Sequence, residues 1–281
     1  MWMRLLVGQL VQRAAAQQVR SLVTEKLQDE LQRGQAAPAG PCDVLCIFAL
    51  NAESGALTDL LEDAQYAKAA SFVERSGTLA RKQVVVAEVG VGAEAAARGT
   101  ADCLAIHQPK WVITAGFAGG LDARLKKGHV LMADEVVDLA GNVLSPNHKV
   151  DRSTASPGLH IGRLLTVDRL ISEPQEKRAL AEQHGAVACD MESFAIAKAC
   201  RQAGVPWLSV RIISDTVDDL LPPEIELLLA EKSLAGKLST AAAAIVNRFS
   251  AAGDMWQLYE DALKCSQRLA RFLKGVVEQV K

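Results

Sequence analysis

The chain has 281 residues, 49% of them hydrophobic, and its 33 acidic and 31 basic residues leave a formal charge of −2. This length and apolar content predict one α/β domain of ordinary size with a large core. The basic residues are scattered, which excludes the positive stripe of a nucleic-acid-binding protein and leaves small molecules as the expected partners. Six cysteines without a secretory signal pattern indicate reduced core thiols in a cytoplasmic protein.

The residues that bind metals are dispersed along the sequence. Cys42 and Cys46 have the spacing CxxxC, but no second cluster of cysteine or histidine completes a site. The five histidines are far apart in the sequence as well. We therefore expect no metal and no cofactor.

The first 34 residues repeat apolar side chains every three to four positions, which predicts a helix. Two interpretations are open: the helix packs on the body or on a second copy of the chain, or it lies on the inner face of a membrane. The second follows from three arginines and no acid among the first 24 residues. Gly34 to Pro41 is a linker, so we expect three segments: residues 1–41, a main domain over 42–250, and a helical extension over 251–281.

The first core strand is predicted at Val44–Leu50, and it delivers Glu53 to its carboxyl end. A second strand at residues 84–89 is followed by Gly90-Val91-Gly92 and an alanine-rich helix that ends near His107. This GxG lacks the third glycine and the ribose-binding acid of a dinucleotide site, which excludes that class of cofactor.

A third strand, Trp111–Thr114, leads into a predicted glycine-rich turn at residues 115–120, where missing side chains let the backbone approach a ligand. Strands are then predicted at residues 129–138 and 159–170, with a polar loop at 145–158 between them. An amphipathic helix follows at residues 174–184.

The stretch Cys189–Asp215 predicts a helix followed by a buried strand. Asp190 is a suitable N-cap and Gly204 a suitable C-terminal cap, and the apolar run to Ile213 suits a central strand. Glu192 would lie in the first helical turn, and Asp215 just beyond the strand, at the edge where open α/β sheets bind ligands. Helices are expected at about 224–249 and 254–281.

The sequence Asp190-Met-Glu-Ser, followed by Val205-Pro-Trp-Leu-Ser-Val-Arg-Ile-Ile-Ser-Asp215, resembles the nucleoside phosphorylase superfamily, nearest its methylthioadenosine/S-adenosylhomocysteine nucleosidase branch. The resemblance implies a three-layer α/β fold with a central mixed, twisted sheet, here with extra terminal helices. It implies that Glu192 binds the ribose 2′ and 3′ hydroxyls, with Met191 against the sugar. Asp215, next to Ser214, would hydrogen-bond or protonate N7 of the purine.

Three further motifs extend the resemblance. Ala49-Leu-Asn-Ala-Glu53 implies that Glu53 activates the attacking water, and Gly116-Phe117-Ala118-Gly119 matches the sugar- and anion-binding segment. Thr166–Leu170 matches the base-stacking segment, where Leu170 or Ile171 would give apolar cover only. Arg211 would steady Glu192, or would be a surface residue at the sheet edge.

Two departures favour water over phosphate as the nucleophile. Relatives usually carry a hydroxyl residue at Phe117, and phosphorolytic members bring arginines after the first strand and before the glycine-rich segment. Here those positions read NAESG and KWVIT. Because arginine is the usual bidentate partner of phosphate, its absence favours a hydrolase.

The resemblance implies an enzyme that releases adenine from a 5′-substituted adenosine, working as a homo-oligomer. Asp215 must then carry a proton while Glu53 stays a base, so their surroundings must differ. A phosphorylase is the first alternative. The run Leu221-Pro-Pro and the long tail weakly resemble the hopanoid-associated branch, whose adenosines carry a bulky apolar 5′ group. The second is a non-catalytic nucleoside-binding module in which Phe117 plugs the anion site.

Overall fold

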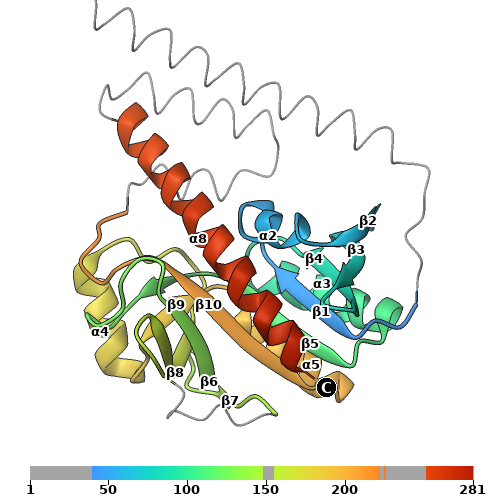
Figure 1. Ribbon diagram of the computed structural model, residues 1–281. Helices are drawn as coiled ribbons and strands as arrows, with labels where there is room; N and C mark the ends of the chain where they lie inside the picture. The colour runs from blue at the N-terminus through green and yellow to red at the C-terminus, as the bar shows by residue number, and fades with distance from the viewer. Residues whose placement is uncertain (1–39, 148–154, 222–224, 226–250, 281) are drawn as a thin grey trace, which may run out of the picture. The chain divides into compact units, whose positions relative to one another are not determined.

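The computed structural model describes residues 40–147, 155–221, 225 and 251–280. The predicted helices at 1–34 and about 224–249, and the centre of the polar loop at 145–158, lie outside these residues. The described residues belong to one compact unit, whose elements are drawn in Figure 1. The strands are β1 (Val44–Phe48), β2 (Glu62–Lys68), β3 (Val73–Leu79), β4 (Lys82–Glu88), β5 (Trp111–Gly120), β6 (Val130–Asp138), β7 (Val143–Leu144), β8 (Leu159–Thr166), β9 (Ala188–Asp190) and β10 (Trp207–Asp215).

One mixed sheet, in the order β10-β6-β8-β9-β5-β1-β4-β3-β2, carries the described helices on its faces. The helices are α2 (Asn51–Thr58), α3 (Ala93–His107), α4 (Pro174–His184), α5 (Ser193–Ala203) and α8 (Ala251–Gln279). An additional pairing between β10 and β5 closes five of the strands into a ring. The predicted α/β class with a central mixed sheet is confirmed, and β5 is the strand that the ring shares with the open remainder.

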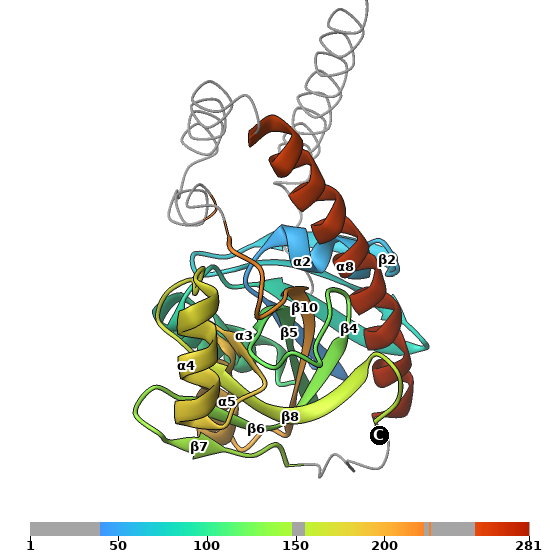
Figure 2. The same ribbon diagram turned by 90° about the vertical axis from the view of Figure 1, so that its left-hand side faces the viewer.

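The side chains of β1 point alternately to the two faces of the sheet, which explains why helices cover both faces. Leu45 and Ile47 pack with side chains of α3 and α5 in one core cluster. Val44 and Cys46 pack with side chains of α2 and α8 in another. Because successive residues of a strand point to opposite faces, a strand that is apolar at every position must be covered on both sides. Figures 1 and 2 show α8 on the face opposite α3 and α5.

The structure differs from the predicted elements in three places. The hairpin β2–β3 was not expected, because it is an edge hairpin whose mostly polar residues show no apolar alternation. Residues 115–120 are not a turn: β5 continues to Gly120, because β10 and β9 bond its main chain. Helix α5 begins at Ser193 with Glu192 as its N-cap residue, because Asp190 ends β9.

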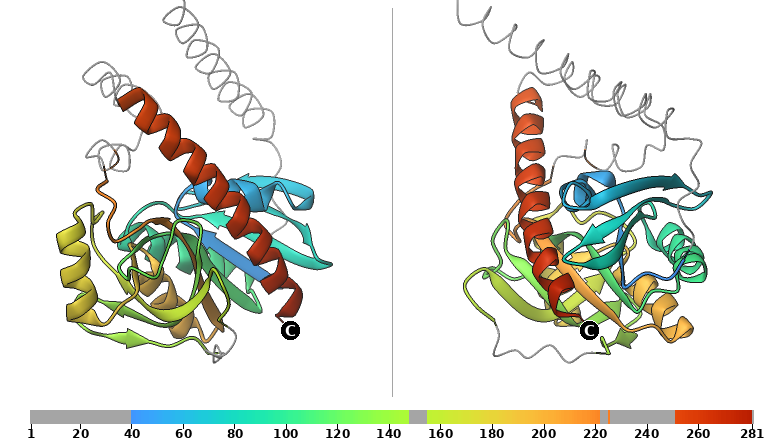
Figure 3. Two further views of the ribbon diagram at one scale, coloured as in Figure 1. Left: turned by 60° about the vertical axis from the view of Figure 1, so that its left-hand side comes forward. Right: turned by 45° about the vertical axis from the view of Figure 1, so that its right-hand side comes forward.

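Helix α8 accounts for the predicted C-terminal helix. Its buried residues Leu269, Leu273 and Val277 join the core cluster of Val44 and Cys46. Figure 3 shows α8 running obliquely past β10. Among the described helices, none is long and apolar enough to cross a membrane. The boundaries of the three predicted segments stay predictions.

Candidate functional site

Glu53 lies in the first turn of α2, directly after β1. Its Oε2 accepts the backbone N–H groups of Ala49 and Leu50, both at 3.1 Å, and its Oε1 accepts that of Phe117 at 2.8 Å. The side chain is 8% exposed. Burial raises the pKa of Glu53, while the Phe117 N–H and the charge of Arg211 partly oppose this rise. The carboxyl group is therefore fixed by neutral donors and binds a proton more readily than an exposed glutamate.

Position 116 of β5 must be a glycine, because the side chain of Glu53 lies directly against it. A Cβ atom at this position would lie 2.6 Å from Oε1 of Glu53 and 2.8 Å from an Arg211 nitrogen. Both distances are shorter than real Cβ contacts, so a side chain would displace the carboxylate. The glycine-rich segment thus serves an acid of the protein as well as any ligand.

Glu192 links the starts of two helices. It is the N-cap residue of α5, and its Oε1 accepts the backbone N–H of Gly92, the N-cap residue of α3, at 2.7 Å. Burial, together with the charges of Asp190 and Glu53, raises the pKa of Glu192 to about 8. Glu192 therefore binds a proton more readily than an exposed glutamate.

Asp190 and Arg211 form a buried ion pair beneath these acids. Oδ2 of Asp190 lies 2.8 Å from one terminal nitrogen of Arg211, which also donates to Thr114 and Ser193. Oδ1 of Asp190 accepts the hydroxyl of Thr166 at 2.8 Å. Arg211 is 3% exposed, so it is not a surface residue, and no direct hydrogen bond to Glu192 is found for it among the described residues. It acts on Glu192 through its charge.

Asp215, the last residue of β10, has a cationic partner. Its Oδ2 lies 2.6 Å from Nζ of Lys177 on α4, and its Oδ1 accepts the hydroxyl of Ser214 at 2.7 Å. Asp215 is 6% exposed and Lys177 is 0% exposed. The carboxyl group of Asp215 is thus held on one oxygen by a buried ammonium group and on the other by a hydroxyl group.

Strand β5 holds these acids in register. Gly116 pairs with Arg211 of β10, and Gly119 pairs with Asp215. A Cβ atom at Gly119 would lie 3.2 Å from Oδ2 of Asp215. Three residues of strand separate the two glycines, a rise of roughly 10 Å. Glu53 and Asp215 therefore lie beside the same strand, at different positions along it.

The other predicted site residues lie near this arrangement. Ile171 is buried in a third core cluster, and Met191 packs partly against that cluster. Phe117 packs its half-buried ring against the core below α8, and the carbonyl of Ala118 accepts the Ser214 hydroxyl at 3.3 Å. Leu170 is half-buried. Their contacts with a ligand stay predictions.

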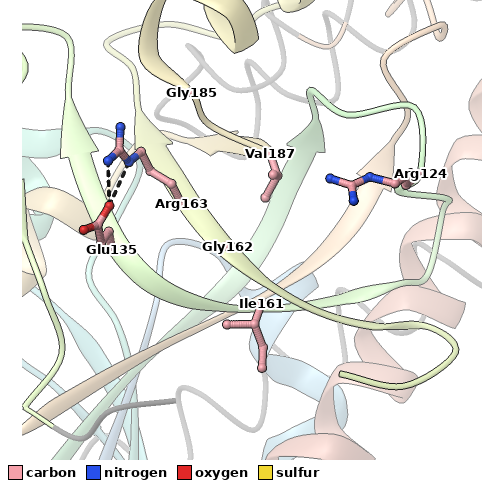
Figure 4. Close-up of a pocket in the computed structure, with 7 residues that line it drawn as sticks. All are labelled: Arg124, Glu135, Ile161, Gly162, Arg163, Gly185 and Val187. Atoms are coloured by element: carbon pink, nitrogen blue, oxygen red, sulfur yellow. Dashed lines mark hydrogen bonds and ion pairs between the residues drawn. The ribbon is translucent and has the colours of Figure 1, made fainter. Parts of the chain in front are cut away.

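Two surface pockets of the described residues lie elsewhere. Figure 4 shows the first, of about 400 Å³, where Arg163 pairs with Glu135 and Arg124 lies on the other side. The second, of about 580 Å³, lies between α3 and α5 and is lined mainly by small and apolar side chains. Glu53, Glu192 and Asp215 line neither pocket. Among the described residues, no group of three potential ligands could hold a metal ion.

Lys177 is the functional neighbour that the sequence did not reveal. A lysine in a polar helix such as PQEKRALAEQH gives no signal of complete burial. The available signal was position: α4 precedes β9 and packs beside the end of β10, so one of its cations could reach the final carboxylate.

Comparisons with known proteins agree with this architecture. The family model described as the phosphorylase superfamily matches residues 43–251. The 5′-methylthioadenosine/S-adenosylhomocysteine nucleosidase of Shewanella oneidensis is 27% identical over 180 residues, which are 56% of this chain and 76% of that protein.

Solved structures of that enzyme share the fold. The enzyme from S. pneumoniae, with a transition-state inhibitor, has a TM-score of 0.64 at 18% identity, covering 85% of this chain and 100% of that one. A mutant from Helicobacter pylori, with 5′-methylthioadenosine in the active site, has a TM-score of 0.63 at 19% identity, covering 85% and 99%. The predicted superfamily is confirmed, while the weaker hopanoid-associated likeness stays a prediction. On the family match over most of its length, this chain belongs to the phosphorylase superfamily.

Proposed function

We propose that this protein is a purine nucleosidase, which hydrolyses the N-glycosidic bond of a 5′-substituted adenosine and releases adenine. The observation that carries the proposal is that Glu53 and Asp215, both buried, lie beside one strand with different partners. The names of the relatives support it: the Shewanella oneidensis protein is a 5′-methylthioadenosine/S-adenosylhomocysteine nucleosidase.

Each acid has a distinct role in this reaction. Glu192 binds the ribose 2′ and 3′ hydroxyls, which selects against deoxyribose, and Met191 contacts the sugar. As the bond between C1′ and N9 breaks, its electron pair passes to the base, and Asp215 gives a proton to N7. Water attacks C1′ and loses its proton to Glu53. The carboxyl of Glu53 and the carboxylate of Asp215 then exchange that proton through solvent, which restores both groups.

The surroundings of Glu53 suit a general base. Burial raises its pKa toward the working pH, where a base removes a proton most effectively. Three backbone N–H groups fix its two oxygens, so the carboxylate does not rotate away from the water.

Water is favoured over phosphate because the nearby cation, Arg211, already uses part of its N–H donors within the protein. Arg211 donates to Asp190, Thr114 and Ser193 at 2.8 to 2.9 Å, so its Nε and one terminal nitrogen are engaged by the protein. A phosphate dianion in a buried site needs donors that the protein does not already use. Phosphorolysis is the alternative outcome of the assay.

The assay measures products from adenosine, methylthioadenosine and adenosylhomocysteine, each with and without phosphate. We expect free adenine and a free sugar, at rates that do not depend on phosphate. Formation of a ribose 1-phosphate that requires phosphate would assign a phosphorylase instead. Tight adenosine binding without any product would indicate the non-catalytic module.

We also propose a cytoplasmic homo-oligomer. The six cysteines are buried free thiols, as in proteins of reducing compartments. Sedimentation of the purified full chain would measure its oligomeric state. Partitioning onto anionic vesicles, with and without residues 1–34, would test the alternative of contact with a membrane.

A further inference from the structure

Lys177 is a buried cation that the reaction as described leaves without a role. Its side chain is 0% exposed, and its ammonium group contacts Oδ2 of Asp215 at 2.6 Å, the carbonyl of Thr216 at 2.9 Å and that of Asp219 at 3.0 Å. A lysine ammonium group has three N–H donors and no acceptor. All three donors are therefore used, and the group is fixed in one orientation.

This arrangement distinguishes the two oxygens of Asp215. An ammonium group cannot accept a hydrogen bond, so a proton on Oδ2 would find no acceptor in Lys177. Oδ1 faces the hydroxyl of Ser214, whose oxygen lies 2.7 Å from Oδ1 and 3.3 Å from the carbonyl of Ala118. A hydroxyl both donates and accepts: it can donate to ionised Asp215, or accept from protonated Asp215 while donating to Ala118. The proton of Asp215 therefore belongs on Oδ1.

We propose that Lys177 is a positioning residue for the departure of the purine, which rests on the proposed function. It confines the proton of Asp215 to Oδ1, and it stabilises the carboxylate that remains when this proton passes to N7. Charge that appears during the reaction is stabilised most by a group that is already oriented toward it. Lys177 contacts Asp215 and not the substrate.

The test distinguishes a role of Lys177 in the departure of the purine from a general structural role of this residue. Methylthioadenosine loses a base that needs a proton, whereas 4-nitrophenyl β-D-ribofuranoside loses a phenolate that needs none. We expect Lys177→Met to lower kcat on methylthioadenosine by about 10–100-fold, part of the range for positioned proton transfer, with KM changed less than about threefold. Its rate on the nitrophenyl riboside should change less than about threefold, because that leaving group takes no proton.

Arg178 supplies the matched control. It is the next residue on α4, is 57% exposed, and pairs with Asp218 of the same turn. Arg178→Met should leave both substrates unaffected. If Lys177→Met does not fold, Lys177→Gln, which keeps N–H donors without the charge, decides the question on the same two substrates.

Two results would overturn the role of Lys177 in different ways. If the unsubstituted protein cleaves methylthioadenosine, and the deciding variant either loses rate equally on both substrates or loses none on methylthioadenosine, Lys177 has no part in base departure. If the unsubstituted protein cleaves no adenosine derivative, the proposed function itself fails, and this role with it.

Discussion

Glu53 and Asp215 are two buried acids with opposite kinds of support. Their exposed fractions are similar, 8% and 6%. Glu53 is held by neutral backbone N–H groups from two segments, whereas Asp215 is held by the ammonium group of Lys177. Neutral donors fix a carboxyl group without a full opposing charge, whereas an ammonium group places a full positive charge beside it. Two carboxyl groups of similar burial therefore have different electrostatic surroundings within one fold.

The largest effect is expected from substitution of Asp215, the acid that contacts the ammonium group of Lys177. Asp215→Asn should lower kcat by about 10²–10⁴-fold, because the proton donor is lost. It should also lower the free energy of unfolding by about 3–5 kcal/mol, because Lys177 is left as a buried charge without its carboxylate. Urea denaturation and the adenine assay measure the two effects.

A second variant sharpens this result. Adding Lys177→Met to Asp215→Asn removes the unpaired charge, so stability should recover while turnover does not. An Asp215→Asn protein as stable as the unsubstituted one would contradict the buried ion pair.

Substitution of Glu53, the acid held by neutral N–H groups, should lower activity much more than stability. Glu53→Gln should reduce kcat by about 10²–10⁴-fold, because an amide cannot take a proton from water. The free energy of unfolding should fall by only about 1–3 kcal/mol, because the amide N–H₂ must face a backbone N–H but no buried cation is exposed. Glu62→Gln, at an exposed acid of β2, is the control and should change neither quantity. If Glu53→Gln lost as much stability as Asp215→Asn, the proposed difference between the surroundings of Glu53 and Asp215 would be contradicted.

A smaller effect is expected from the glycine between the acid and the arginine. Gly116→Ala puts a methyl group 2.6 Å from Oε1 of Glu53, and overpacking of this kind costs about 1–3 kcal/mol. We expect lower stability by denaturation, and lower kcat as Glu53 is displaced. In Gly55→Ala, on α2, the nearest atom would be 3.9 Å away, so that variant should instead gain about 1 kcal/mol from helix propensity. If the two variants had equal stability and equal kcat, the side chain of Glu53 would be able to move aside without cost.

The last effect concerns pH. The pKa of Glu192 is raised to about 8 by burial and by the charges of Asp190 and Glu53, so the unliganded folded protein holds a proton that the unfolded chain releases near 4.5. The associated stability is fully present below about pH 4.5 and is lost as pH rises through about 8. Thermal unfolding should therefore show Tm decreasing from pH 6 to 9, by about 2–4 °C for each kcal/mol lost. Glu192→Gln should flatten this decrease, and an unchanged slope would contradict the raised pKa.

Sequence patterns predicted the central elements well because the strands of the core are apolar at nearly every position. α4 and α3 occur where their caps and periodicity placed them. The hairpin β2–β3 was missed because its stability comes from pairing with β4, not from its own apolar pattern. Residues 115–120 were taken for a turn because glycine usually marks one, but here β10 and β9 extend the strand.

The candidate acids were predictable for a different reason. Glu53 and Asp215 follow apolar strands, and strand ends of an α/β sheet converge. Their partners were not predictable, because a salt bridge between α4 and β10, or an N–H from β5, depends on packing between segments distant in sequence. The assigned roles of these acids stay predictions until the variants are measured.

The hydroxyl of Ser266 on α8 donates to the main-chain carbonyl of Glu53 at 3.1 Å, across 213 positions of sequence. A growing polypeptide can complete this contact only after Ser266 has left the ribosome. Until α8 arrives, the apolar face formed by Val44, Cys46 and their neighbours has no cover from that helix. The nascent protein should therefore depend on chaperones until α8 has been made, which is longer than its early strands suggest.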